Sequence, residues 1–333
     1  MADAAAAATA SATSVAGTEA AAARRTASGF SSEDEHLLIR HLRPDELKQA
    51  MEIWKEQGLE ESENNVSTFY QVDPEGFFAT VDTRTGRVVA TCACVRQHES
   101  LFFVGMYAVR KHLQGHGIGI RLWRTMARRL GDCNAGLNAV PQHLSKYRDR
   151  AGFGHVDTWN TLVFSGTAIN TDKLAKPTDQ LRAVPVSNDL LPQVIAYDAL
   201  VHCYNREKAV TYTVYDTDGF ARAVVRRRPD GSEVVCGFGK IGTNILGGAM
   251  MGPMYCEDRQ VADVLLRALV DGNPLTRVSL TMMVVDCNPD AVAMAQDIGL
   301  ESHMRVPRCY RKAIVPARFE QIFAQHDLNF SAF

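Results

Sequence analysis

The sequence has 333 residues, of which 46% are hydrophobic and 22% are charged, as in an ordinary globular protein. This length favours two domains. The formal net charge of -2 argues against a nucleic acid as an obligate partner, because such partners require a strongly basic surface. No apolar run approaches the roughly 18 residues of a membrane-spanning helix, so no membrane partner is expected.

The cysteines are scattered through mostly apolar segments, without a C-x-x-C pair or a nearby histidine ligand. This spacing excludes the common zinc motifs and a disulfide framework. It predicts reduced core thiols of an intracellular protein, and no metal site. The residues concerned are Cys92, Cys94, Cys133, Cys203, Cys236, Cys256, Cys287 and Cys309.

Residues 1–35 consist mostly of Ala, Ser and Thr without a hydrophobic period, which predicts a disordered tail. Arg24 and Arg25, together with few acidic residues, are a feature of transit peptides. Positive charge is sparse, however, and this favours a cytosolic tail. We therefore expect a cytoplasmic protein, with a mitochondrial location as the alternative.

Residues 36–166 alternate between strand and helix patterns, which predicts an α/β or α+β domain built on a mixed sheet. The expected strands span 36–42, 76–82, 87–98, 102–109, 134–140 and 158–165. The expected helices span 44–57, 118–130 and 141–150, and the acidic segment 59–72 forms a short helix or an ordered loop.

The same pattern then occurs a second time. Residues 167–180 are polar and predict a linker, after which residues 181–333 repeat the unit. Gly152 ends a helix in the first unit, and Gly299, about 147 residues later, ends the corresponding helix in the second. The chain is therefore expected to contain one fold in two copies.

The C-terminal segment adds one element to the second unit. Within residues 316–328, Phe319, Ile322 and Phe323 fall on one helical stripe. This spacing predicts a C-terminal helix that docks on the second unit.

A glycine-rich loop, Gln114-Gly115-His116-Gly117-Ile118-Gly119, lies between the expected strand 102–109 and helix 118–130. Its glycines remove side chains from a turn whose backbone N–H groups lie at a helix N-terminus, which is a favourable site for an anion. Basic residues surround the loop and favour a phosphate or pyrophosphate. They are Arg110, Lys111, His112 and Arg121.

The spacing of the glycines excludes two common phosphate loops, because neither G-x-x-x-x-G-K-[ST] nor G-x-G-x-x-G is present. The loop resembles the coenzyme A loop of the Gcn5-related N-acetyltransferases (GNAT), [RQ]-x-x-G-x-[GA]. Gln114, Gly117 and Gly119 fill this pattern, after a strand and before an amphipathic helix. The resemblance implies two tandem GNAT folds, over residues 36–166 and 181–333.

The resemblance also implies acetyl-CoA as the acyl donor and a set of residues that bind it. The end of the central strand, from Met106 to Val109, would offer backbone N–H groups to the thioester carbonyl and the pantetheine arm. The glycine loop would hold the pyrophosphate. The implied binding residues are Tyr107, Ala108, Val109, Gln114, Gly115, His116, Gly117, Ile118 and Gly119.

The second unit lacks the glycine loop. At the corresponding position it has Glu257 and Asp258, two acids that satisfy a helix N-terminus themselves and repel a pyrophosphate. The resemblance therefore covers both halves in outline but extends to the cofactor motif only in the first. It implies a degenerate second domain that shapes the acceptor pocket.

Acyl transfer to an amine requires a group that protonates the leaving thiolate and a base that deprotonates the amine. In the resembled family a tyrosine on the helix before a Gly-Phe pair often protonates the thiolate, which implies Tyr147. It lies five residues before Gly152 instead of the usual four, so a packing role is the alternative. No base is assigned; the possible residues are His98, Glu99, His116 and His143.

We therefore expect an acetyl-CoA-dependent N-acetyltransferase that acts on the primary amine of a small molecule or amino acid, by direct attack in a ternary complex. Protein lysine acetylation and a non-catalytic CoA-binding sensor are the alternatives. Glu60, Glu61 and Glu63 border the acceptor pocket in the implied fold and could receive a cationic amine. Their alternative role is a solvated acidic face.

Overall fold

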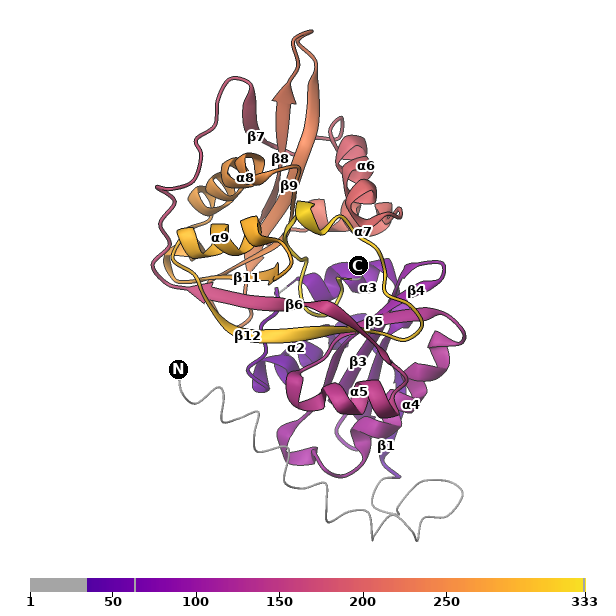
Figure 1. Ribbon diagram of the computed structural model, residues 1–333. Helices are drawn as coiled ribbons and strands as arrows, with labels where there is room; N and C mark the ends of the chain where they lie inside the picture. Colours follow the sequence, from indigo (N-terminus) through magenta and orange to yellow (C-terminus); the bar gives the residue numbers. More distant parts are fainter. Residues whose placement is uncertain (1–34, 63, 332) are drawn as a thin grey trace.

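The computed structural model describes residues 35–62, 64–331 and 333. It shows two lobes joined by one continuous 13-stranded sheet (Figure 1). The predicted disordered tail lies outside the described residues except for Glu35, and Glu63 lies outside them as well.

The first repeat contains six strands and four α-helices among the described residues. Its strands are β1 (Leu37–His41), β2 (Phe77–Asp82), β3 (Arg87–His98), β4 (Leu101–Val109), β5 (Asn134–Asn138) and β6 (His155–Gly166). Its helices are α2 (Leu47–Glu56), α3 (Asn65–Val72), α4 (Ile118–Leu130) and α5 (Leu144–Arg150).

The second repeat follows the same order of elements. Its strands are β7 (Leu181–Pro185), β8 (Phe220–Arg227), β9 (Glu233–Thr243), β10 (Ala249–Cys256), β11 (Leu280–Val285) and β12 (Glu301–Tyr310). Its helices are α6 (Leu191–His202), α7 (Glu207–Val214), α8 (Arg259–Gly272) and α9 (Pro289–Asp297). A short strand, β13 (Ile322–Ala324), follows near the C-terminus.

The two repeats exchange their last strands. The sheet runs β1-β2-β3-β4-β5-β12-β6-β11-β10-β9-β8-β7, so β12 pairs with β5 of the first repeat and β6 pairs with β11 of the second. β6 and β12 also pair with each other and cross side by side between the lobes in Figure 1. The expectation that the strand at 158–165 completes the sheet of residues 36–166 is therefore wrong, because β6 extends the other half.

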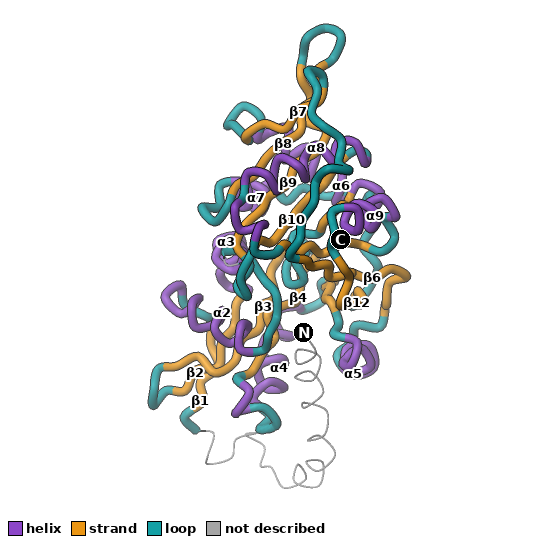
Figure 2. The backbone as a smooth tube through the Cα atoms, turned by 90° about the vertical axis from the view of Figure 1, so that its left-hand side faces the viewer, coloured by secondary structure: helices purple, strands orange, loops and turns teal. Residues whose placement is uncertain are grey.

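Helices cover both faces of the first half of the sheet. On α4 the buried residues Ile118, Leu122, Met126 and Leu130 recur four apart, as the sequence pattern predicts, and form one core cluster with the sheet. On α2 the buried residues belong to a second, separate cluster. The backbone tube in Figure 2 shows α2 and α4 at different sides of the strands.

The predicted C-terminal helix is wrong. Residues 316–328 contain only a short 3-10 turn, Phe319–Gln321, followed by β13, which pairs with β10. The side chains from Ile322 to Asp327 are all buried, and a surface helix would expose some of them. An extended segment that inserts beside β10 and β11 of the second repeat buries both of its sides, which explains this conformation.

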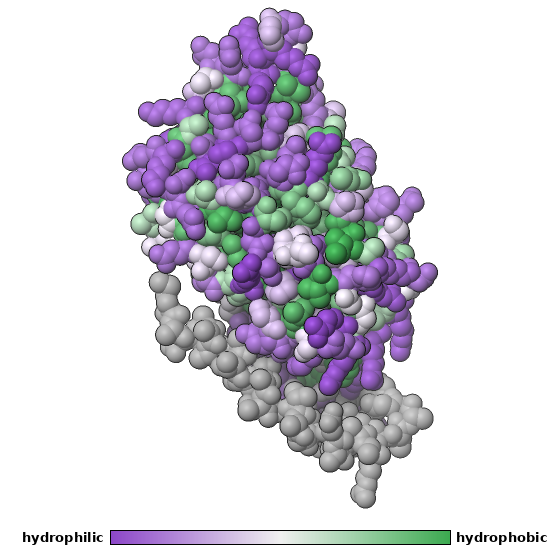
Figure 3. All heavy atoms as spheres, viewed as in Figure 1, coloured by the Kyte–Doolittle hydropathy of each residue, from purple (hydrophilic) through white to green (hydrophobic). Residues whose placement is uncertain are grey.

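The described part of the chain contains no helix long and apolar enough to cross a membrane. On the face in Figure 3, hydrophilic residues cover most of the surface and hydrophobic ones appear in small groups. All eight cysteines are free and five are buried, which confirms the prediction of core thiols for those five. The described residues include no group of His, Cys, Asp and Glu suited to a metal ion.

Candidate active site

The central strands of the first repeat separate and open a gap in the sheet. β4 and β5 pair in parallel from Leu101 and Asn134 to Val104 and Leu137, and no pairing follows beyond that point in the described residues. The backbone groups of β4 after Val104 therefore require partners other than β5. We call this gap the β4–β5 opening.

A bulge in β4 turns the strand at the opening. Thr91 and Ala93 of β3 pair with Ala108 and Gly105 of β4, so β4 contains one extra residue there, and Met106 has a φ of +52°. Met106 belongs to the core cluster of α2, whereas Val104 belongs to that of α4. A regular strand would place both residues on one face.

The glycine loop has the geometry that anion binding requires. Gly115 and Gly117 have φ values of +83° and +79°, a conformation that side chains disfavour. Gly117 is the N-cap of α4, and no described side chain forms a cap hydrogen bond there. The first N–H groups of the helix therefore remain available to a phosphate.

Two other residues of the motif hold the loop in place. Gln114 donates from Nε2 to the Val109 carbonyl at 3.1 Å and to Gln57 Oε1 at 3.1 Å. A Cβ atom at Gly119 would lie 2.6 Å from the Tyr107 hydroxyl oxygen. Gly119 therefore allows Tyr107 to approach the first turn of α4, and it has a packing role that the sequence pattern does not show.

The remaining implied binding residues also have definite positions. Ile118 is buried in the α4 core, which leaves only its backbone for ligand contact. The exposed His116 has Nδ1 3.0 Å from the Gln114 carbonyl oxygen. Ala108 and Val109 lie on β4 after the bulge, so they border the β4–β5 opening. The structure thus places the implied CoA residues around one end of α4.

A basic pocket of about 490 Å³ adjoins the glycine loop. Arg84 and Arg110 already pair with Asp82 and Glu56, and Arg87, His112 and His116 add further basic groups. This charge fits the anionic end of coenzyme A. The complete lining is His36, Leu37, Asp82, Arg84, Thr85, Arg87, Val89, Arg110, His112, Leu113, His116 and Ile118.

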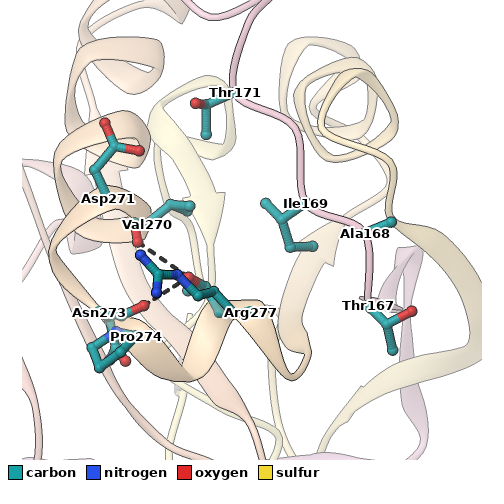
Figure 4. Close-up of a pocket in the computed structure, with 10 residues that line it drawn as sticks. Thr167, Ala168, Ile169, Thr171, Val270, Asp271, Asn273, Pro274 and Arg277 are labelled. Atoms are coloured by element: carbon teal, nitrogen blue, oxygen red, sulfur yellow. Dashed lines mark hydrogen bonds between the residues drawn. The ribbon is translucent and has the colours of Figure 1, made fainter.

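Another pocket, of about 610 Å³, lies between the linker after β6 and the end of α8 (Figure 4). Its charged lining residues are Asp271 and Arg277, and most of the others are small or aliphatic. It is built by the linker and the second repeat, away from the glycine loop. We therefore place the candidate site at the β4–β5 opening.

Tyr147 lies on the α4 side of the sheet. Its ring is 5.6 Å from that of Trp123, and it packs against the same core cluster as Tyr107. Burial raises the pKa of Tyr147 above its usual range, so the phenol is protonated at neutral pH. The structure thus brings Tyr147 near the implied CoA residues despite its shifted position in the sequence.

Glu61 lies on the opposite side of the β4–β5 opening and is fully buried. Its carboxylate accepts hydrogen bonds from Ser62 N at 2.7 Å, Asn65 Nδ2 at 3.0 Å and Asn329 Nδ2 at 2.5 Å. Burial, followed by the charge of Asp327, raises its pKa well above the usual range. The solvated acidic face considered for Glu61 is therefore wrong, because buried donors surround it.

The other acidic and basic candidates lie elsewhere. Glu60 faces Asn244 and His303 of the second repeat. His98 and Glu99 lie before β4 begins, at its paired end. Sequence reasoning missed Asn329 and Asp327, because nothing local indicates that residues far along the chain reach Glu61.

Comparison with known proteins agrees with this geometry. Residues 39–144 match the model of the acetyltransferase (GNAT) family, and residues 194–324 match that of an acetyltransferase (GNAT) domain. The chain belongs to the Gcn5-related N-acetyltransferases. It is a two-repeat GNAT protein and an acyl-CoA-dependent N-acyltransferase, and members of this family use acetyl-CoA as the donor.

Solved structures share the fold of this GNAT protein. A Pyrococcus horikoshii protein assigned as an acetyltransferase is 16% identical, with a TM-score of 0.68 over 89% of this chain and 96% of its own. A Sphaerobacter thermophilus GCN5-related N-acetyltransferase is 13% identical, with a TM-score of 0.55 over 85% of this chain and 97% of its own. Saccharomyces cerevisiae N-myristoyltransferase with bound myristoyl-CoA is 9% identical, with a TM-score of 0.57 over 83% of this chain and 82% of its own. No curated protein sequence matches significantly.

The second GNAT repeat fills its own opening. β10 and β11 pair in parallel from Ala249 to Met251, after which β13 pairs with β10 and the Gln325 N–H donates to the Met283 carbonyl at 2.7 Å. The tail of the chain therefore occupies the position that corresponds to the β4–β5 opening.

The helix after this second opening also has its own cap. Asp258 accepts a hydrogen bond from Val261 N at 2.9 Å, and Arg226 contacts Glu257 at 3.0 Å and Asp258 at 3.3 Å. Carboxylates therefore satisfy the N-terminus of α8, at the place where the first repeat leaves N–H groups available. This arrangement supports the predicted loss of cofactor binding in the second repeat.

One molecule of acetyl-CoA is therefore expected to bind per chain. Isothermal titration calorimetry with acetyl-CoA measures this stoichiometry directly. A value of two would contradict the assignment of a single site to the first repeat.

Proposed function

We propose that the chain transfers the acetyl group of acetyl-CoA to the primary amine of a small molecule or amino acid, by direct attack in a ternary complex. The observation that carries this proposal is the covered acceptor side of the β4–β5 opening. α3 packs against α7 of the second repeat, and Asn64 donates a hydrogen bond to Asp216 across this contact. In the tail beside it, His326, Asp327 and residues 329–331 are buried. An acceptor that approaches from this covered side must be small.

The charge around the covered space favours a cationic amine. Glu61 and Asp327 are buried there, and Asp216 and Asp218 approach from the loop after α7. Lys240 neutralises part of this charge, since its Nζ lies 2.8 Å from Asp216 Oδ2. Asp327, Asp216 and Asp218 together outweigh Lys240, so an ammonium group would find a net negative environment even when Glu61 is protonated.

Release of free CoA across a panel of acceptors tests this function. The panel contains small primary amines, amino acids and a lysine-rich peptide, each incubated with the protein and acetyl-CoA. We expect amine-dependent thiol release with at least one small acceptor. Release with the peptide alone would support protein lysine acetylation, and slow hydrolysis with no amine dependence would support a CoA-binding sensor.

We propose that Tyr147 donates a proton to the leaving thiolate. Its location on the α4 side of the sheet, near Tyr107, supports this role, and burial keeps the phenol protonated. A Tyr147→Phe variant is expected to lower kcat by about 10²-fold and to leave the Kd for acetyl-CoA unchanged. Tyr70→Phe is a suitable control, because the Tyr70 hydroxyl binds the Leu42 carbonyl on the other face. Unchanged turnover of Tyr147→Phe would favour the packing role.

A further inference from the structure

The side chain of Asn329 links β4, at the β4–β5 opening, to Glu61 in the segment before α3. Its Oδ1 accepts a hydrogen bond from the Met106 N–H at 3.0 Å, and its Nδ2 donates to Glu61 Oε2 at 2.5 Å. Asn329 is 3% exposed, so water does not compete for these contacts. A buried carboxamide thus joins the bulge of β4 to a buried carboxylate.

The end of an asparagine side chain has the same chemical groups as the product of an acetylation. An N-acetylated amine contains a carbonyl oxygen and an adjacent nitrogen, and Asn329 presents both in this order. The reaction requires a hydrogen-bond donor for the carbonyl oxygen and an acceptor for the proton of the amine. The Met106 N–H and the Glu61 carboxylate take these two positions around Asn329.

We propose that Glu61 is the general base of the reaction, and that the Asn329 carboxamide occupies the place of the transferred acetamide group. This inference rests on the proposed function, because it assigns the roles within the same site. The Met106 N–H is then the donor that stabilises the carbonyl oxygen of the acetyl group during transfer.

The proposed step is balanced. The amine nitrogen forms a bond with the acetyl carbon, and the bond between this carbon and the CoA sulfur breaks with its electron pair on sulfur. Glu61 takes the proton that the nitrogen loses, and the thiolate receives a proton from Tyr147 on the other face of the sheet. Exchange with water then restores Glu61 and Tyr147.

The tail is shaped to hold Asn329 in this position. Asp327 Oδ1 accepts hydrogen bonds from the backbone N–H groups of Asn329 at 2.7 Å and Phe330 at 2.5 Å. Phe330 stacks on Phe69, with 4.4 Å between the ring centroids. A Cβ atom at Gly105 would lie 2.5 Å from the Asn329 carbonyl oxygen, so β4 has a glycine where the tail approaches. The acetyl group of the donor and Asn329 therefore compete for one space.

Comparing the binding of acetyl-CoA with that of free CoA shows whether Asn329 competes with the acetyl group alone or hinders binding of the whole coenzyme. An Asn329→Ala variant is expected to bind acetyl-CoA about tenfold more tightly than the parent chain, since two hydrogen bonds of the competing group are lost. Free CoA has no acetyl group, so its Kd is expected to stay the same. Calorimetric titration of both ligands measures the two values.

Ser331→Ala is the matched control for this titration. The Ser331 hydroxyl accepts a hydrogen bond from Asp327 N in the same turn and contacts neither Met106 nor Glu61 in the described interactions. We expect it to leave both Kd values unchanged. Equal tightening of both ligands by Asn329→Ala, or no tightening, would overturn the assigned position of the carboxamide. Failure of the parent chain to bind acetyl-CoA would instead reject the proposed function.

The role of Glu61 is tested with Glu61→Gln. This variant is expected to lower kcat by about 10²-fold with the acceptor found in the panel, and to retain acetyl-CoA binding. Asp286→Asn is a matched control outside the site, because Asp286 likewise accepts from a backbone N–H (Asn160) and an asparagine amide. Full turnover of Glu61→Gln would exclude the base role.

A pH profile separates a base from a structural carboxylate. Asp327 is the charged group that acts on Glu61. His326 Nδ1 lies 2.8 Å from Asp327 Oδ2, and Lys240, paired with Asp216, acts on His326. Burial lowers the pKa of His326, so Asp327 is the principal charge near Glu61. Asp327→Asn removes a negative charge, lowers the pKa of Glu61 and should move the acidic limb of kcat/KM to lower pH. A limb that stays in place would contradict the proposal.

Discussion

A Gly117→Glu variant is expected to lose at least about 10³-fold in affinity for acetyl-CoA, because an added carboxylate repels the pyrophosphate by several kcal/mol in a partly buried site. The φ of +79° at this position also disfavours any side chain. The new carboxylate would lie at the N-terminus of α4 and satisfy the N–H groups that the ligand requires. Calorimetric titration with acetyl-CoA measures the loss.

Gly131→Glu provides the control for backbone strain. Gly131 is the C-cap of the same helix, has a φ of +49°, and would have no atom within 4 Å of an added Cβ. The substitution therefore adds the same residue at the other end of α4, away from the loop. We expect it to keep acetyl-CoA binding. Retained affinity in Gly117→Glu would show that the phosphate site lies elsewhere.

An Asp198→Asn variant is expected to reduce the free energy of unfolding by about 3–5 kcal/mol, because it leaves a buried cation without its counterion. Asp198 is fully buried, and its oxygens accept from Arg206 Nε at 2.7 Å and Nη2 at 2.8 Å. The Tyr255 hydroxyl, 3.2 Å from Arg206, carries no charge to replace the carboxylate. Urea unfolding of both proteins measures the difference.

The pH dependence of this effect has a definite sign. The charges of Arg206 and His202 outweigh burial and lower the pKa of Asp198 below its usual range. A lowered carboxyl pKa stabilises the fold above the unfolded pKa of about 4, and this stabilisation disappears as the pH falls through the folded pKa. The parent chain should therefore lose more stability than Asp198→Asn in strong acid.

Asp149→Asn serves as the control for this comparison, since the Arg148–Asp149 pair is about half-exposed. Exposed pairs contribute little to stability, so the unfolding midpoint should stay the same. An unfolding midpoint of Asp198→Asn equal to that of the parent chain would show that the buried pair provides no net stabilisation.

Local sequence patterns were sufficient to predict the glycine loop and the helix that follows it. The spacing of the buried residues of α4 follows directly from the helical period, and the structure confirms this helix. The positive φ values of Gly115 and Gly117 likewise agree with the expected turn. These features depend on neighbours in the chain, which a single sequence displays.

The strand exchange could not be predicted in this way. β6 has a strand pattern whichever sheet edge it joins, and its neighbours β11 and β12 lie more than 100 residues further along the chain. Either arrangement satisfies the same local preferences. The choice depends on long-range pairing, which no local period contains.

The conformation of the tail and the burial of Glu61 likewise depend on long-range contacts that local patterns do not contain. Phe319, Ile322 and Phe323 have helical spacing, but the segment from Ile322 onward lies extended beside β10 of the second repeat and buries both sides. Glu61 is in an acidic segment typical of a surface, and its partner Asn329 is 268 residues away. The run from Asp327 to Ser331 contains Asp, Asn and Ser, which favour turns, but it overlaps only the end of the segment predicted as a helix.

Because the repeats exchange β6 and β12, neither repeat has a complete sheet without the other. A mutation that unfolds the second repeat also removes β12, the strand that borders β5. It removes with it Arg308, whose Nε donates to Asn138 Oδ1 of the first repeat at 2.9 Å. The second repeat is therefore needed for the fold of the first, whether or not it binds a ligand. Neither repeat can be deleted without leaving the other with an incomplete sheet.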